Sequence, residues 1–95
     1  MKSVQKRFTT EARRLIKKFP PGVKAPLRAL TDEIAENPLL GKELKEKLRG
    51  FRSARYGNYR VIYEYLEDKN LVIFHYLGRR KDVYALFERL INFRA

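Results

Sequence analysis

The stretch that decides the fold is FRSARYGNYRVIYEYLEDKNLVIFHYL, at residues 51–77. It is rich in β-branched and aromatic residues, and its hydrophobic residues recur with a period close to two, which is typical of strands. Gly57 and Asn58 suit a two-residue hairpin turn. We therefore predict a three-stranded meander with strands at 51–56, 59–66 and 71–77. The third strand is apolar on both faces, so we place it centrally and expect Gly78 to end it.

Alternation assigns the side chains of the meander to faces. One face of the second strand carries Tyr59, Val61, Tyr63 and Tyr65, and one face of the third carries Leu71, Ile73, His75 and Leu77. The tyrosine row resembles a stacking ladder for RNA, but a row of aromatic residues on one strand face is more often part of a core. For His75, which lies among apolar residues, we expect a hydrogen-bonded structural role.

Upstream of the meander, the hydrophobic period changes to that of helices. Thr9 or Thr10 can cap a first helix, which Pro20-Pro21-Gly22 stops. A second helix is predicted at roughly 24–37, with Pro26 in its first turn, where a missing N–H is tolerated. Residues 3–8 give a weak strand signal, and 39–50 predict a basic connector with one or two helical turns. Downstream, Asp82 can cap a last helix at 83–92.

This order predicts an α+β fold of one domain covering residues 1–95. Two N-terminal helices pack on one face of a mostly antiparallel sheet (β-α-α-β-β-β), and a short C-terminal helix follows.

Composition narrows the class of function. Lys and Arg outnumber Asp and Glu by 22 to 11, giving a net charge of +11, which favours a polyanionic partner. The absence of cysteine excludes disulfides and thiolate metal sites, and a single histidine excludes a zinc-binding histidine pair. We therefore expect no metal and no cofactor. The N-terminus has no apolar segment, so we expect a cytoplasmic protein that does not interact with membranes.

Two short motifs combine glycine, arginine and tyrosine: GNYRVIY at 57–63 and GRRKDVY at 78–84. The planar guanidinium of arginine binds phosphate through two parallel hydrogen bonds. Tyrosine can stack on a base or move a proton near a phosphate. The pair of motifs indicates binding of nucleic acid.

With these motifs, the chain length and the predicted order of elements, the sequence resembles the RelE/ParE toxins of toxin–antitoxin systems. The runs that carry the resemblance are RSARYGNYRVIYEY at 52–65 and HYLGRRKDVY at 75–84. RelE-type members are ribosome-dependent endoribonucleases that cut messenger RNA, whereas ParE-type members poison DNA gyrase on the same scaffold. The resemblance implies catalytic roles for Arg60, Arg80 and Tyr84. ParE-type chains usually lack the last two, so their presence favours the nuclease branch.

One departure concerns the strand before the hairpin. RelE-type enzymes often carry lysines there, whereas this chain offers Arg52 and Arg55, so the general base is left open. Around the scissile phosphate we expect RNA-binding roles for Arg52, Arg55, Arg79 and Lys81. Each residue has a structural alternative, such as a surface ion pair for Arg60 or a core position for Tyr84. The cluster Arg13, Arg14, Lys17 and Lys18 is most simply a solvated helix face that could also contact ribosomal RNA.

The expected partners are a cognate acidic antitoxin and the ribosome with its mRNA, with no small-molecule substrate. The rival functions are a gyrase inhibitor on the same scaffold and a non-catalytic module that binds RNA or an acidic protein.

Overall fold

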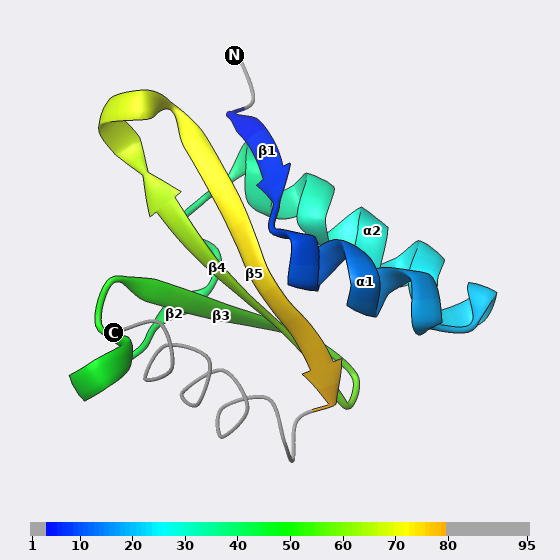
Figure 1. Ribbon diagram of the computed structural model, residues 1–95. Coiled ribbons are helices and arrows are strands. Elements are labelled where there is room, and N and C mark those ends of the chain that lie inside the picture. The colour runs from blue at the N-terminus through cyan, green and yellow to red at the C-terminus, as the bar shows by residue number, and fades with distance from the viewer. Residues whose placement is uncertain (1–3, 80–95) are drawn as a thin grey trace.

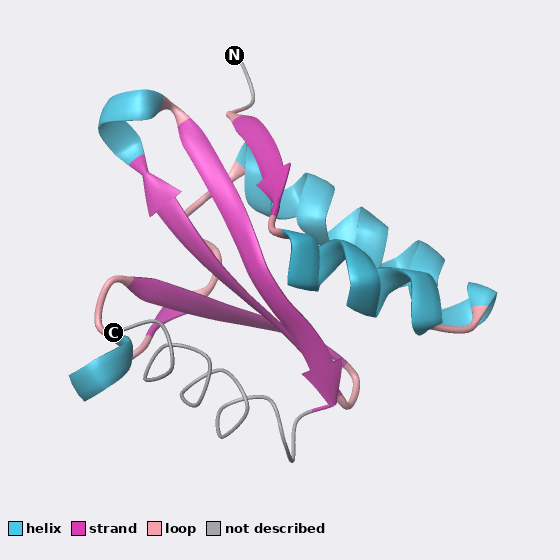
Figure 2. Ribbon diagram, viewed as in Figure 1, coloured by secondary structure: helices cyan, strands magenta, loops and turns pink. Residues whose placement is uncertain are grey.

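The fold was analysed in a computed structural model that describes residues 4–79. Two helices lie together on one side of a five-stranded sheet whose strand order is β1-β5-β4-β3-β2 (Figure 1). The strands are β1 (Gln5–Phe8), β2 (Lys42–Glu43), β3 (Phe51–Tyr56), β4 (Tyr59–Leu66) and β5 (Leu71–Arg79). The helices are α1 (Thr10–Lys18) and α2 (Pro21–Glu36), and short 3-10 turns occupy Glu46–Leu48 and Glu67–Lys69. The predicted α+β architecture is confirmed (Figure 2).

The sheet is antiparallel except for one pairing. β2 pairs with β3, β3 with β4 and β4 with β5 in antiparallel fashion, whereas β1 joins β5 in parallel. The predicted third strand is an interior strand, because it lies between β1 and β4. The middle position of the sheet belongs to β4.

β5 is longer than predicted. Gly78 does not end the strand, because it pairs with Arg60, and Arg79 pairs with Tyr59 at the start of β4. The pairing of β4 with β5 therefore extends to Tyr59, the first residue of β4 after the hairpin turn. Arg79 belongs to this strand, whose predicted end is Gly78. The predicted helix at 83–92 lies outside the described residues.

α2 begins three residues before its predicted start. Pro21 occupies the first helical turn, where its missing N–H needs no partner, so the Pro20-Pro21-Gly22 run separates two helices and also opens the second. Pro26 consequently lies inside the helix rather than in its first turn. The predicted cap of α1 is confirmed, because the hydroxyl of Thr9 accepts a hydrogen bond from the Ala12 N–H at 3.1 Å.

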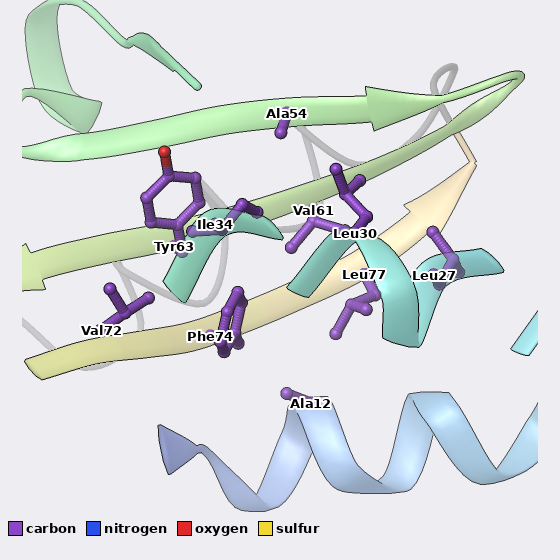
Figure 3. Close-up of a cluster of buried hydrophobic side chains, with 10 residues drawn as sticks. All are labelled: Ala12, Leu27, Leu30, Ile34, Ala54, Val61, Tyr63, Val72, Phe74 and Leu77. Atoms are coloured by element: carbon purple, nitrogen blue, oxygen red, sulfur yellow. The ribbon is translucent and has the colours of Figure 1, made fainter. Parts of the chain in front are cut away.

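The main core lies between the helices and one face of the sheet, which we call the helix face (Figure 3). Ala12 of α1 and Leu27, Leu30 and Ile34 of α2 supply the helical side. The strands supply Ala54, Val61, Tyr63, Val72, Phe74 and Leu77. Tyr59 and Tyr65 pack against this cluster, so the tyrosine row faces the core rather than RNA.

A bulge in β5 changes the predicted alternation. Ile62 pairs with Tyr76 but Tyr63 pairs with Phe74, so His75 is the extra residue. Leu77 therefore points to the helix face, while the ring of His75 contacts Phe51 and Glu64 on the opposite face. The prediction that His75 and Leu77 share a face is wrong for this reason.

A buried polar clamp holds the loop between α2 and β2 against the sheet. The Tyr63 hydroxyl donates to the Pro38 carbonyl at 2.7 Å and accepts from the Gly41 N–H at 2.8 Å. The guanidinium of Arg52 donates to the Gly41 carbonyl at 2.6 Å. A Cβ at Gly41 would lie 2.7 Å from the Tyr63 hydroxyl, so only glycine permits this approach.

Burial raises the pKa of the Tyr63 phenol above its usual range, although the Gly41 hydrogen bond and the nearby Arg52 charge act in the opposite direction. The phenol therefore stays neutral in the folded protein and keeps its proton for the Pro38 carbonyl.

We expect Tyr63→Phe to lower the free energy of unfolding by about 1–3 kcal/mol at neutral pH, because the buried Gly41 N–H and the part-buried Pro38 carbonyl lose their partner. Urea denaturation measures this difference. Tyr56→Phe is the matched control, since Tyr56 is 47% exposed and should change stability by less than about 0.5 kcal/mol.

The same measurement has a pH dependence of known sign. Because the pKa of Tyr63 is higher in the folded than in the unfolded state, its contribution is complete below pH of about 10 and declines above it. The difference between the wild type and Tyr63→Phe should shrink in that alkaline range. Equal stability of the two proteins at neutral pH would contradict the clamp.

Candidate anion-binding site

Two arginines face each other across the β3–β4 hairpin. Gly57 has a φ of 56°, which suits the two-residue turn, and the resulting register pairs Arg55 with Arg60. The next pair along the hairpin, Ala54 and Val61, points into the core of the helix face. Since side chains alternate along strands, Arg55 and Arg60 project from the opposite face. Directly opposed residues have Cβ atoms roughly 5 Å apart, so both guanidinium groups can reach one anion.

The surroundings of the two cations differ. Arg60 is half-buried and its Nε is shielded from solvent, whereas Arg55 is exposed. Like charges directly opposite each other in a sheet destabilise it, and a bound anion would remove that repulsion. The arrangement therefore suits a phosphate group, which accepts hydrogen bonds from both guanidinium forks.

The structure does not bring Arg52 and Arg79 to this pair. Arg52 pairs with Tyr63 on the helix face and donates to Gly41, so its guanidinium serves the polar clamp. Arg79 pairs with Tyr59, and its guanidinium carbon lies 6.0 Å from the centre of that ring. Both predicted RNA-binding residues thus belong to the helix face.

Arg80, Lys81 and Tyr84 lie outside the described residues. The chain does leave the sheet close to the arginine pair, because Arg79 ends β5 beside Tyr59, which directly precedes Arg60 (Figure 1). Convergence of Arg80 and Tyr84 on Arg60 stays a prediction.

Lys42 is a further cation that sequence reasoning missed. Lys42 pairs with Ser53 of β3. Ser53 precedes Arg55 by two residues, so both side chains lie on the same face of β3. Lys42, Arg55 and Arg60 also line one groove of about 610 Å³ along the edge of β3, with α2 forming the other wall. No strand signal surrounds Lys42 in the sequence, because a two-residue strand is too short to show alternation.

His75 and Glu64 form a separate pair on the same face as the arginines. The Nε2 atom of His75 lies 3.2 Å from a carboxylate oxygen of Glu64, and its ring packs edge-on against Phe51. Glu64 is four residues along β4 from Arg60, which is roughly 13 Å in a strand, so the histidine is remote from the candidate site.

A second groove, of about 440 Å³, lies between α1, α2 and β1. Its lining combines apolar side chains, including Phe8, Ile16 and Phe19, with basic ones. The basic side chains are Lys6, Arg13, Lys17, Lys24 and Arg28. Lys6 is paired with Asp32, which also lines the groove. Arg13 and Lys17 of the predicted basic helix face therefore border a groove rather than a flat surface.

Within residues 4–79, the structure contains no group of three or more acidic or histidine side chains that could hold a metal ion. In the same part of the chain, neither helix has the length and apolar character needed to cross a membrane.

Removing one charge of the arginine pair should stabilise the fold. We expect Arg55→Gln to raise the free energy of unfolding by about 0.2–1 kcal/mol at low salt, because the repulsion of Arg60 disappears. The gain should shrink at 1 M salt, where the Debye length is about 3 Å. Arg7→Gln, at an exposed position of β1, is the control that removes a charge elsewhere. A loss of stability in Arg55→Gln would contradict the repulsive pairing.

Comparison with known proteins places the chain in a family. Residues 3–84 match the family described as the ParE toxin of the type II toxin–antitoxin system, parDE. The chain is 36% identical over 80 residues to Toxin RelG of Mycobacterium tuberculosis, covering 82% of this chain and 92% of that protein.

Solved structures of toxins show a similarity consistent with this family match. The RelBE2 toxin–antitoxin complex of M. tuberculosis contains a chain that is 33% identical, with a TM-score of 0.78 and coverage of 83% of this chain and 100% of that one. The isolated E. coli RelE toxin, at 17% identity, shares the fold with a TM-score of 0.73, covering 96% of this chain and 99% of that one. The family match over residues 3–84 and the relative at 36% identity show that this chain belongs to the ParE toxin family, within the RelE/ParE superfamily of type II toxin–antitoxin toxins.

Proposed function

We propose that this toxin is a ribosome-dependent endoribonuclease that cleaves messenger RNA and so inhibits translation. The observation that carries the proposal is the Arg55–Arg60 pair, two permanent cations projecting from the sheet face opposite the helices. Among the relatives, the similarity to a RelG toxin and to a RelE structure supports the proposal.

The proposed reaction uses the substrate's own 2′-OH as the nucleophile. Its oxygen attacks the adjacent phosphorus and forms a 2′,3′-cyclic phosphate, while the bond to the departing 5′-oxygen breaks. A base takes up the 2′-OH proton, and an acid protonates the departing 5′-oxygen. This chemistry needs no metal, because the nucleophile is already held next to the phosphorus. The protein must supply the base, the acid and stabilisation of the extra negative charge that the phosphate carries in the transition state.

In this proposal, Arg60 and Arg80 stabilise that charge, because guanidinium groups are always charged and match the geometry of phosphate oxygens. Arg55 holds the same or a neighbouring phosphate. Tyr84 acts as the base or stacks on a base of the message, and Lys81 is a second proton carrier. The ribosome aligns the RNA, so a site without a histidine can be slow alone and still effective.

The proposed partner in the resting state is an acidic, partly disordered antitoxin. The net charge of +11 favours such a partner, and solved structures of related toxins include complexes with their antitoxins.

A second candidate is a gyrase-directed inhibitor without catalysis of its own. The observation that favours it is the family match, whose description names the ParE toxin. The cation pair would then bind DNA or an acidic surface of the target.

Cleavage of a defined message on purified ribosomes tests the proposal. We expect the wild type to cut the message, and Arg60→Ala and Arg80→Ala each to lower the single-turnover rate by roughly 10²–10³, the usual effect of removing a preorganised charge donor. Arg7→Ala on β1, at the far side of the sheet, is the matched control and should cut normally. Intact message together with DNA breaks in cells would favour the gyrase candidate, and neither effect would favour a non-catalytic module.

The role of Tyr84 is tested by its pH–rate profile. If the phenol is the base, Tyr84→Phe should lower the rate by roughly 10²–10⁴ and remove the rise of the wild-type rate with pH. If Tyr84 only stacks on a base, phenylalanine should retain most of the rate. A fast variant with an unchanged profile would exclude Tyr84 as the base.

A further inference from the structure

The shortest strand of the sheet places a third cation beside the arginine pair. In β2, Lys42 lies directly opposite Ser53, and Arg55 follows Ser53 by two residues on the same face. Diagonal neighbours of this kind are about 7–8 Å apart. A lysine ammonium on its flexible four-carbon stem can span that separation and meet an anion held by the arginines.

The groove along the edge of β3 supports this placement. Its lining includes Lys42 from β2, Arg55 from β3 and Arg60 from β4, so three neighbouring strands each contribute one cation. Glu33 of α2 also lines the groove, from the helix face, so the lining includes these three cations and one carboxylate. Such a groove attracts the backbone of a polyanion and orients it along the strand edge.

The position of Lys42 depends on the residue before it. Both backbone polar groups of Gly41 are held by side chains. Its N–H donates to the Tyr63 hydroxyl at 2.8 Å, and its carbonyl accepts from the Arg52 guanidinium at 2.6 Å. Both contacts come from the helix face of the sheet, and Tyr63 is fully buried. The clamp therefore sets where the chain re-enters the sheet edge as β2.

We propose that Lys42 is a third phosphate-binding residue of the candidate site, and that Tyr63 and Arg52 are positioning residues that hold it there through Gly41. The proposal deepens the proposed function and rests on it for the identity of the ligand as RNA.

Binding of a short single-stranded RNA that carries 2′-O-methyl groups, and so cannot be cut, provides the test. Lys42→Ala should weaken binding about tenfold at low salt and reduce the slope of log K against log salt by about 0.7, the value expected for one lost phosphate contact. Lys42→Arg should restore the slope. Lys69→Ala is the matched control, because Lys69 is exposed in the turn between β4 and β5, and it should change neither quantity.

The clamp is tested by a double-mutant cycle. Tyr63→Phe should weaken RNA binding in the wild-type background and have little further effect in Lys42→Ala, because its influence passes through Lys42. The same loss in both backgrounds would overturn the positioning role.

Two results would overturn the role of Lys42: equal effects of Lys42→Ala and Lys69→Ala, or a wild type that does not bind the RNA. Failure of the proposed function looks different. The wild type could leave ribosome-bound message intact and still bind the RNA with a salt slope that Lys42→Ala reduces. That result would contradict the proposed cleavage and support Lys42 as a phosphate-binding residue. If the message is cut and Lys42→Ala binds the RNA in the same way as Lys69→Ala, the proposed cleavage is supported and the phosphate-binding role of Lys42 is contradicted.

Discussion

The register of the β3–β4 hairpin is the constraint on which the rest of the structure depends. The turn at Gly57 and Asn58 fixes it, and the core then fixes which face each side chain takes: Ala54 and Val61 must point to the helices. Arg55 and Arg60 are the direct neighbours of Ala54 and Val61 along their strands, so they must project the other way. A slip of one residue would bury both arginines and expose the core, which is energetically prohibitive. The candidate site is thus positioned by hydrophobic packing that it does not itself contribute to.

The meander could be predicted from sequence because its turn chemistry and its two-residue period agree. The bounds of β3 and β4 match the prediction for that reason. The features that were missed are those with no local signal. A β-bulge at His75 depends on how β5 twists against β4, and β2 is too short to show a period. The early start of α2 shows that Pro21 can open a helix as well as separate two.

The same distinction applies to the candidate site. The pairing of Arg55 with Arg60 follows from a two-residue turn, and the opposite placement of Arg52 follows from simple alternation, since it lies three residues before Arg55. Arg79 is different. Without the bulge, alternation from Ile73 would place Arg79 on the face of Arg60, and the single extra residue moves it to the helix face beside Tyr59. Lys42 reaches the site only through pairing across a loop, which no local pattern reports.

The two faces of the sheet carry different tasks, and this separation bears on how function should be inferred in this family. The helix face is specified by volume and periodicity, which many sequences satisfy, so chains of low identity can share it. The opposite face carries a second buried cluster of Leu48, Ile62 and Tyr76. It also carries charges whose repulsion the packing must overcome, and those charges are not needed for folding. Fold similarity therefore conveys little about chemistry. Under the proposed function, an RNA-cleaving toxin would differ from a binding inhibitor on this scaffold in which cations the strand ends bring within reach of one phosphate. In this chain the hairpin register places Arg55 opposite Arg60, and the pairing of β2 with β3 places Lys42 opposite Ser53, two residues from Arg55.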